Sequence, residues 1–553
     1  MIFKNEDGSR ISAPYKATNG LVRVRRILGR AFRFSNLLIV FAALLASHSA
    51  SAQAPALPTT APGGLIGADD YIRADRLGIT FVGFIDNMGV ERYRNALILG
   101  AGWNRWPLYW DRVEAQPGEY DWLAYDRLVA ADIRHGLRTN AILLGRPAFW
   151  QAGNSISNLF QPIFADGSDS GGPDVAINLD NPWAQFVHYA VMRYMPGGVL
   201  ARHNDFDADD GIRAWEVWNE PDVPQFWNAG SEAYARLLKV AAIIIKTVDP
   251  NAKVLFGGLL YANDQGFFSR VLRQIQVDPL RDRFNWFFDV VALHSYDDPW
   301  RSGWLTKVVE DTLKAYRIAR PVWVNETGVS VWDDYPGPVW AENPEQRNRL
   351  ATAQQQAHFL VMSAAFAWSK GVEVVFYHQL YDDCGNYPAG TDFLPHHGEL
   401  CANGVCFGDA FGIYRNERGS HCFSHHPHAN TPRPVAQAFA LLAEIFGRQP
   451  FTPVSLSGID DEVTIIVFQR ANGERIVVLW NNTKEERTVA LKAAGDIATL
   501  RFINGRTATM PAVNVNYSIA LKPAADFSFP DLESNRSSAI GGEPVILVET
   551  PVQ

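Results

Sequence analysis

Apolar residues in the first two thirds of the chain fall into short runs that alternate with longer amphipathic stretches. Between the short runs lie helical patterns, of which residues 231–249 and 345–370 are clear examples. Strands separated by helices run parallel, because a parallel pair needs a crossover connection. Eight such repeats within residues 66–440 predict an α/β fold, a (β/α)₈ TIM barrel with insertions. The strand-like runs lie at 78–85, 101–106, 138–144, 214–218, 253–257, 290–294, 321–324 and 372–377.

The pattern changes after about residue 445, where helical periodicity stops. Short strand-like runs follow one another, separated by turn residues such as those at 471–474. This arrangement predicts a C-terminal all-β sandwich over residues 445–550. Neither GxGxxG after the first run nor GxxxxGK[ST] occurs, so nucleotide-binding open sheets lack their usual motifs. The runs of this region lie at 463–469, 475–480, 488–492, 498–503, 517–521 and 544–549.

The N-terminal segment has the organisation of a targeting sequence. Residues 1–52 hold 8 Lys and Arg against 2 Asp and Glu, and an apolar run at 37–46 precedes Ala-Ser-Ala at 50–52. This order is typical of a secretory signal peptide that is removed after Ala52. An uncleaved anchor is the alternative, but the run is about ten residues long and a span needs roughly 20. A linker rich in Pro, Ala and Thr is expected at 53–65.

The charge balance narrows the class of partner. The chain of 553 residues has 50 Lys and Arg against 59 Asp and Glu, and without residues 1–52 its net charge is near −15. An acidic protein of this kind has no phosphate-binding surplus of cations, so no nucleic-acid partner is expected. We expect an exported protein, periplasmic or extracellular, with no membrane span after signal cleavage and no implied protein partner. The choice between the general and the twin-arginine export route stays open.

Two Asn–Glu steps stand at the ends of the fourth and seventh predicted strands. The sequence WEVWNEP at 215–221 contains Glu220, and VWVNETG at 322–328 contains Glu326. Barrel enzymes carry their catalytic groups at these strand ends. Two carboxylates that face one pocket can cleave a glycosidic bond, because one protonates the leaving oxygen while the other attacks carbon or activates water. A lone Glu would be a solvated loop residue, whereas the pair favours a site.

The motifs WNEP at 218–221 and VNETG at 324–328 resemble the acid/base and nucleophile signatures of clan A glycoside hydrolases, which are TIM-barrel retaining glycosidases. The segment 215–227 is most similar to the family 39 branch of β-xylosidase-like enzymes and exopolysaccharide hydrolases. The resemblance implies that Glu220 is the general acid/base and Glu326 the nucleophile. It also implies a carbohydrate substrate and no cofactor.

The same resemblance implies roles for further polar residues. Arg105 and Tyr296 would contact the nucleophile, Asn219 would bind the sugar 2-hydroxyl, and His294 belongs to the same short motif as Tyr296. For His294 and Tyr296 the alternative is an ordinary buried polar residue. For Arg105 the alternative is a salt bridge at the barrel rim.

Aromatic side chains are candidates for stacking on sugar rings. Sixteen of the 17 Trp precede residue 445. We expect about half of the candidates to line the site and the others to pack in the core. Trp227 and Tyr377 are preferred because they lie near predicted strand ends. The full set is Trp103, Trp106, Trp110, Trp150, Trp227, Trp300, Trp332, Tyr377 and His378.

All four cysteines lie in an insert at 384–428 that also holds six of the 13 His. In an exported protein they predict two disulfides of undetermined connectivity. A metal site is the alternative, since His421 and His425 have HxxxH spacing. Gly419 and Pro427 disfavour the helix that this spacing requires, so no metal is expected. The cysteines are Cys384, Cys401, Cys406 and Cys422.

The sequence therefore predicts an exported retaining glycoside hydrolase that cleaves O-glycosidic bonds of an oligo- or polysaccharide by double displacement. Two alternatives remain. One is a non-catalytic carbohydrate-binding or scaffold protein on a decayed barrel, and the other is a transglycosylase. The motifs determine neither the sugar, the anomeric preference, endo or exo action, nor the oligomeric state.

Overall fold

A computed structural model describes residues 73–172, 174–331, 334, 350–382, 410–415, 417, 428–458, 461–524 and 540–550, with backbone alone at 350, 401–402 and 405–406. The expected signal peptide, the linker, Trp332 and the side chains of all four cysteines lie outside these residues, so those predictions stay predictions. The short strands β15 (Cys401–Ala402) and β16 (Val405–Cys406) pair antiparallel, with Cys401 opposite Cys406. No helix in the described ranges has the length and apolar character needed to cross a membrane.

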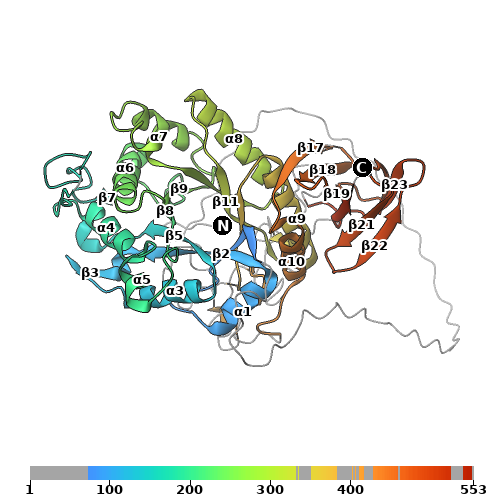
Figure 1. Ribbon diagram of the computed structural model, residues 1–553, viewed down its shortest axis with the longest axis horizontal. Helices are drawn as coiled ribbons and strands as arrows, with labels where there is room; N and C mark the ends of the chain where they lie inside the picture. The colour runs from blue at the N-terminus through green and yellow to red at the C-terminus, as the bar shows by residue number, and fades with distance from the viewer. Residues whose placement is uncertain are drawn as a thin grey trace, which may run out of the picture. The chain divides into compact units, whose positions relative to one another are not determined.

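Eight parallel strands close into a barrel in chain order, with the last strand pairing back to the first (Figure 1). The α/β TIM-barrel prediction is therefore confirmed. The fourth and seventh strands of the barrel are β8 and β11, as the two Asn–Glu motifs require. The barrel strands are β1 (Ala74–Thr80), β2 (Ala101–Tyr109), β5 (Arg138–Leu144), β8 (Ala214–Asn219), β9 (Lys253–Leu259), β10 (Val290–Tyr296), β11 (Val322–Gly328) and β14 (Val374–Tyr377).

Helices follow the barrel strands and cover them. The helix expected at 231–249 forms one residue earlier, and the one expected at 345–370 is helical from Ala353, where Thr352 and Gln355 make a capping box. Residues 345–349 lie outside the described part. The helices are α1 (Val90–Leu99), α2 (Trp110–Val113), α3 (Leu123–Arg134), α4 (Pro182–Tyr194), α5 (Val199–Asn204), α6 (Gly230–Val248), α7 (Phe267–Gln276), α8 (Arg301–Ala315), α9 (Ala353–Ser369) and α10 (Pro434–Phe446), with short 3₁₀ turns η1 (Ala148–Trp150) and η2 (Asn285–Phe287).

Short strand pairs elaborate the loops that follow barrel strands. Each pair comes after the C-terminal end of β2, β5, β11 or β14, so the loops add structure at the end of the barrel where catalytic groups are expected. These pairs, besides β15 with β16, are β3 (Glu114–Gln116) with β4 (Glu119–Tyr120), β6 (Gln151–Ala152) with β7 (Ser155–Ile156), and β12 (Ser330–Val331) with β13 (Leu350–Ala351).

The first barrel strand, β1, begins four residues before the run that was predicted at 78–85. Phe81 has a left-handed backbone with φ +56° and ends β1, and the N–H of Val82 then donates to Oδ1 of Asn104 rather than to a strand neighbour. Val82 is buried in this turn and Phe81, Phe84 and Ile85 are partly buried, so the apolar run continues past the end of the strand. Gly78 is needed inside β1, because a Cβ there would lie 2.3 Å from Cδ1 of Phe376.

Side chains inside the barrel alternate along each strand, and those near the N-terminal ends of the strands form an apolar layer. The layer closes that end of the barrel, so polar groups that point inward further along the strands are shielded from solvent on that side. Its members are Ala214, Leu255, Val290, Ala292, Trp323, Val374 and Phe376, with Trp103 packed against them.

The C-terminal region consists of antiparallel sheets, shown in orange and red in Figure 1. Two of its strands, β17 and β22, were not predicted. Both are largely exposed edge strands, so they lack the apolar alternation that marks a half-buried strand. One sheet has the order β17-β18-β19-β24-β21-β22 and the other pairs β20 with β23. The strands are β17 (Phe451–Ser457), β18 (Val463–Arg470), β19 (Arg475–Asn481), β20 (Arg487–Lys492), β21 (Ile497–Phe502), β22 (Thr507–Pro511), β23 (Asn516–Leu521) and β24 (Val545–Glu549).

The two sheets pack face to face around one apolar core, which confirms the predicted sandwich. Tyr517, Ile519 and Leu521 of the smaller sheet meet residues of β19, β21 and β24, such as Leu479 and Leu547. Helix α9 contacts β17 and β18 on one side and the barrel on the other. This position explains why α9 is buried on nearly all of its faces.

Candidate active site

The two predicted glutamates meet at the C-terminal end of the barrel. Glu220 directly follows β8, and Glu326 lies within β11. One oxygen of each carboxylate and a ring nitrogen of His294 lie within 4.8 Å of one another. Each glutamate is 1% exposed. Two carboxyl groups this close suit a mechanism in which one of them attacks the sugar directly, since inversion needs room for a water between them.

A shift in strand register turns Glu326 into the barrel. Leu293 of β10 pairs with Val324 of β11, but the next residue, His294, pairs with Glu326, so Asn325 is an extra residue in the strand. Simple alternation from the inward Trp323 would place Asn325 inside and Glu326 outside. The extra residue acts as a bulge, and both side chains make contacts inside the barrel.

At the end of β8, a residue with a left-handed backbone conformation likewise changes which side chain faces the barrel interior. Trp218 has φ +69°, which is rare for a bulky side chain. Its indole Nε1 donates to the carbonyl oxygen of Phe226, 2.8 Å away, and its ring packs against that of Trp227. With Trp218 turned outward, Asn219 faces the interior, where its Oδ1 lies 3.2 Å from Nη2 of Arg105.

Arg105, on β2, joins the residues of the site. Its Nη1 donates to Oε1 of Glu326 at 2.5 Å. On its other edge, Nε and Nη2 donate to the two oxygens of Glu216 at 2.8 and 2.9 Å. The guanidinium is fully buried, and the negative charges of these two glutamates raise the pKa of Arg105 against the opposing effect of burial. It is therefore a permanent cation beside Glu326.

His294 lies between the two carboxylates. Its Nδ1 is 2.8 Å from Oε1 of Glu220 and 3.5 Å from Oε2 of Glu326. Its Nε2 is 3.3 Å from Nη2 of Arg105. Burial lowers the pKa of the imidazole, but the charges of Glu326 and Glu220 and the hydrogen bond with Glu220 outweigh burial and raise it, which favours the protonated ring. Gly258 leaves room for this ring, because a Cβ there would lie 2.0 Å from Nε2. His294 thus donates to Glu220 and fixes one of its oxygens.

The environment of Glu326 stabilises its charge. Oε2 of Glu326 accepts a hydrogen bond from the hydroxyl of Tyr296, and Oε1 accepts the one from Arg105. Burial alone would raise the pKa of this carboxyl, but the charges of His294 and Arg105 outweigh burial and hold the pKa well below its ordinary value. Glu326 is therefore ionised at neutral pH.

Glu220 has the opposite electrostatic character. Burial raises the pKa of its carboxyl, and the charge of Glu326 adds to this, while the hydrogen bond from His294 opposes it. Its second oxygen, Oε2, is buried and has no hydrogen-bond partner among the described residues. A carboxyl with a raised pKa and one uncommitted oxygen can donate a proton to a group placed beside it.

The two preferred aromatic candidates lie away from the carboxylates. Trp227 is buried against Trp218 and donates to the carbonyl of Gly230. Tyr377 is fully buried and its hydroxyl donates to the carbonyl of Phe411. Alternation along β14 explains this position, because Phe376 belongs to the inward apolar layer and its neighbour Tyr377 points outward.

His378 reaches the site instead of Tyr377. Its ring stands edge-on to that of Tyr296 with centroids 5.9 Å apart, and its Nδ1 lies 3.0 Å from Oγ1 of Thr80. Burial lowers the pKa of His378 to about 4, although the charge of Glu326 acts in the opposite direction. The imidazole is therefore neutral at pH 7.

The other tryptophan candidates divide between core packing and the periphery. Trp106 and Trp110 are completely buried, and Trp103 packs against the apolar layer at the opposite end of the barrel. In the loop after β5, Nε1 of Trp150 donates to Oε1 of Glu114 in β3. Trp300 is partly exposed at the start of α8. None of these five makes a described contact with Glu220 or Glu326.

Sequence reasoning missed several polar residues of the site. Glu216 and Asn325 contribute hydrogen bonds below the two carboxylates, and Asn140 extends this network. Asp222 accepts from the backbone N–H groups of Leu260 and Tyr261, and burial raises its pKa to about 6. For Glu216 a signal was present, since a charged residue at an inward position of a barrel strand requires a buried partner.

The same group of residues has the spacing of a metal site, because Glu220, His294 and Glu326 each offer a ligand atom within 4.8 Å of the others. However, both oxygens of Glu326 already accept hydrogen bonds from Tyr296 and Arg105, and a guanidinium this close repels a cation. The arrangement suits proton transfer and nucleophilic attack better than cation binding. Of the cysteine and histidine side chains in the insert at 384–428, that of His428 alone belongs to the described residues, so the predictions for the insert stay predictions.

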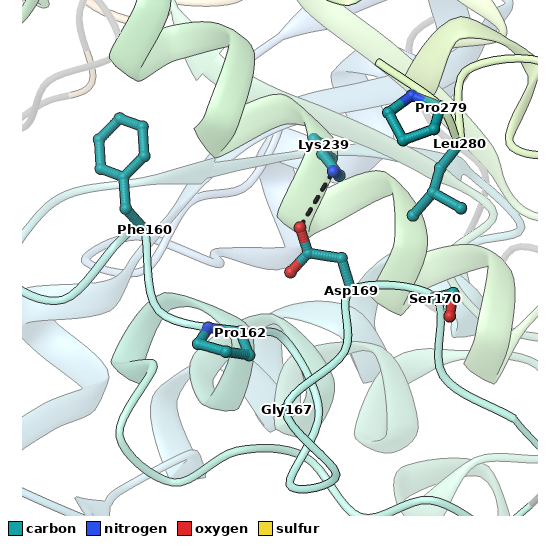
Figure 2. A pocket seen from close by; sticks show the side chains of 8 residues that line it. All are labelled: Phe160, Pro162, Gly167, Asp169, Ser170, Lys239, Pro279 and Leu280. Carbon is teal, nitrogen blue, oxygen red and sulfur yellow. Dashed lines mark ion pairs between the residues drawn. The ribbon is translucent and has the colours of Figure 1, made fainter.

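Two surface cavities lie elsewhere. One of about 400 Å³ adjoins α6, and its polar groups pair with one another, as Lys239 Nζ and Asp169 Oδ2 do at 3.0 Å (Figure 2). It is lined by Phe160, Pro162, Gly167, Asp169, Ser170, Lys239, Pro279 and Leu280. The other, of about 670 Å³, opens at the N-terminal ends of the strands beside Trp103, Arg138 and Lys253. Neither cavity includes the carboxylate pair.

Comparisons with known proteins agree with the motifs. No protein-family model matches the chain. A β-xylosidase from Caldicellulosiruptor saccharolyticus is 25% identical over 281 residues, which are 49% of this chain and 49% of that protein. The chain thus spans about half the length of this curated relative.

Solved structures extend the likeness to most of the chain. A family 39 glycoside hydrolase from Bacteroides cellulosilyticus WH2 has a TM-score of 0.52 at 18% identity, covering 86% of this chain and 81% of that one. A monomeric β-xylosidase from Caulobacter crescentus CB15 has a TM-score of 0.51 at 17% identity, covering 87% and 96%. The resemblance to clan A glycoside hydrolases is confirmed, with family 39 among the similar structures. At these identities the structural likeness establishes the fold.

Proposed function

We propose that this protein is a retaining glycosidase in which Glu326 is the nucleophile and Glu220 the general acid/base. The observation that carries the proposal is the opposite shift of two adjacent buried carboxyls, with the pKa of Glu326 lowered and that of Glu220 raised. Double displacement needs one carboxylate that is ionised and one carboxyl that is protonated at the same pH. A carbohydrate-binding scaffold has no need of this difference.

In the first step Glu326 attacks the anomeric carbon while Glu220 transfers its proton to the departing glycosidic oxygen. Oε2 of Glu220 is the donor atom, because Oε1 is engaged by His294. Arg105 and Tyr296 hold the attacking carboxylate in one orientation. Asn219, fixed at Arg105, is placed to bind the sugar hydroxyl next to the anomeric carbon.

In the second step Glu220, now a carboxylate, removes a proton from a water that attacks the glycosyl–Glu326 ester. The bond between Glu326 and the sugar breaks, and the sugar leaves with its original anomeric configuration. His294 donates to Glu220 throughout and steadies its charge when the proton has gone. An acceptor sugar in place of water would give transglycosylation by the same residues.

The relatives indicate which substrate to test first. Two of the three similar proteins are named β-xylosidases, so we propose a β-linked pentoside such as a xyloside. We also propose export, supported by the basic and apolar organisation of residues 1–52. Expression of the full chain in a bacterial host should then yield an exported protein that begins at Gln53.

The test is hydrolysis of p-nitrophenyl β-D-xyloside, followed by aryl glucosides, galactosides and arabinosides and by polysaccharides. Proton NMR of the first product formed should show the retained anomer before mutarotation. An inverted first product would contradict the mechanism. Absence of hydrolysis with every substrate, together with measurable binding of oligosaccharides, would favour the non-catalytic alternative.

A further inference from the structure

Glu216 is a buried carboxylate that the proposed chemistry does not use. It lies on β8 two residues beyond Ala214 of the apolar layer, so alternation turns it into the barrel below the reacting pair. It is completely buried. An isolated charge at such a position would be strongly unfavourable, so its partners reveal why it is there.

Four donors from three other strands surround this carboxylate. Arg105 gives two of them, Asn325 Nδ2 donates to Oε2 at 2.7 Å, and the N–H of Gly258 donates to Oε1 at 3.0 Å. A carboxylate has about four acceptor positions, so those of Glu216 are filled. It has no free position for a substrate, so it can influence the reaction only through the groups that it holds and through its negative charge.

Arg105 is the neighbour that reaches the reacting groups. A guanidinium is planar and rigid, so fixing Nε and Nη2 on the two oxygens of one carboxylate determines where Nη1 points. Here Nη1 points at Oε1 of Glu326. Without Glu216, the same fork could pair through two nitrogens with Glu326, which would neutralise the nucleophile more strongly and pull it from its position.

We propose that Glu216 is a positioning residue, which holds Arg105 so that a single guanidinium nitrogen contacts Glu326. This inference rests on the proposed function of Glu326 as nucleophile. Glu216 acts on the rate of the glycosyl transfer steps and not on sugar binding, because its hydrogen bonds are all made to protein groups. Its loss should therefore lower kcat and leave KM nearly unchanged.

The test is a double-mutant cycle in the mature protein with Glu216→Gln, Arg105→Lys and both together. Each single change should lower kcat on the active aryl glycoside by on the order of 10²-fold, the effect of misplacing a reacting group by about 1 Å. Because Glu216 acts through Arg105, the double variant should be no slower than Arg105→Lys alone. Glu216→Asp, which keeps the charge but cannot reach both nitrogens, should also lose rate and serves if Glu216→Gln does not fold.

A matched control is a second buried bidentate pair among the described residues, Arg433 with Asp382, which lies outside the carboxylate cluster. Asp382→Asn should lower the thermal unfolding midpoint about as much as Glu216→Gln but change kcat less than about threefold. An equal loss of kcat in this control would mean that general loosening of the barrel explains the effect, which would overturn the inference.

The pH profile gives a second readout that a purely structural role would not change. Removal of the negative charge of Glu216 favours ionisation of nearby carboxyls, so the pKa of Glu220 should fall and the alkaline limb of kcat/KM should move to lower pH. An unmoved limb, or losses that multiply in the double variant, would refute the positioning role. A wild-type protein that hydrolyses no glycoside would instead refute the proposed function itself.

Discussion

The interior of the C-terminal sandwich and the interior of the barrel follow different rules. The sandwich core consists of apolar residues and one tyrosine, contributed by facing strands such as β19 and β24. The barrel has an apolar layer at the N-terminal ends of its strands, and its other end holds Arg105, Glu216, Glu220 and Glu326, all buried. One core is built for stability, whereas the other keeps charges out of water where they strengthen one another's effects.

The difference shows where the functional part of the molecule lies. A buried charge is unfavourable unless it is paired, and each charge at the C-terminal end of the barrel has a defined partner. The exception is Oε2 of Glu220, which has no partner among the described residues. A core of paired charges would give the sandwich no more stability than its apolar core does. The buried charges of the barrel are therefore explained by the chemistry that they serve and not by folding.

Glu326→Ala should give the largest effect that separates the charged barrel interior from the apolar sandwich interior. Removal of the nucleophile should lower kcat/KM on the order of 10⁵-fold or more, as loss of a covalent nucleophile does elsewhere. The protein should stay folded, because Arg105 keeps both of its contacts with Glu216. Steady-state kinetics and circular dichroism measure the two effects. Added azide should occupy the vacated space and give a glycosyl azide of inverted configuration; a retained azide product would reverse the assignment of the two glutamates.

Glu220→Ala should have a smaller effect that depends on the leaving group. Substrates that need protonation should slow by about 10²- to 10⁴-fold, and activated aryl glycosides much less. Azide should restore turnover by attacking the covalent intermediate, and the product should be a glycosyl azide of retained configuration. A series of aryl glycosides with different leaving-group pKa values measures the dependence, and an equal loss across the series would rule out Glu220 as the acid.

Leu547→Ala in the sandwich should lower the stability of the protein and leave its activity unchanged, the opposite of what is expected for the two glutamates. Leu547 is completely buried at the centre of β24, between Val477 and Leu500. Its truncation should lower the free energy of unfolding by about 2–5 kcal/mol, from lost burial and the cavity left behind. Chemical denaturation measures this loss, and kcat and KM measured well below the unfolding temperature should stay at wild-type values. A fall in kcat would show that the sandwich takes part in the reaction.

The pH dependence should be the mildest test. The proposed mechanism uses Glu326 ionised and Glu220 protonated, so kcat/KM should rise with pH through the pKa of Glu326 and fall through that of Glu220. The first pKa is lowered and the second raised from their ordinary values, so the plateau between them should be broad. In Glu220→Ala the alkaline limb should disappear. Persistence of that limb would assign it to another group, such as Asp222, whose pKa burial raises to about 6.

The sequence by itself determined the architecture and the location of the chemistry. Repeated apolar runs of strand length, separated by amphipathic helices, leave a closed parallel barrel as the arrangement that buries every run. The motif at 215–221 runs through the end of β8 and the motif at 322–328 spans β11, so local sequence places Glu220 and Glu326 at the C-terminal end of the barrel. These features depend on the spacing of apolar residues and on residues adjacent in the chain, and both can be read directly from the sequence.

Only the tertiary structure decided which side chains meet inside that barrel. Arg105, Glu216 and Glu326 come from three strands separated by more than a hundred residues, and their contacts depend on barrel closure. Two local departures from alternation, the extra residue at Asn325 and the left-handed Trp218, choose which neighbours point inward. Periodicity assumes a regular strand and therefore cannot register such departures. At β14, by contrast, alternation holds. Phe376 points inward and Tyr377 outward, and the next residue, His378, reaches the site.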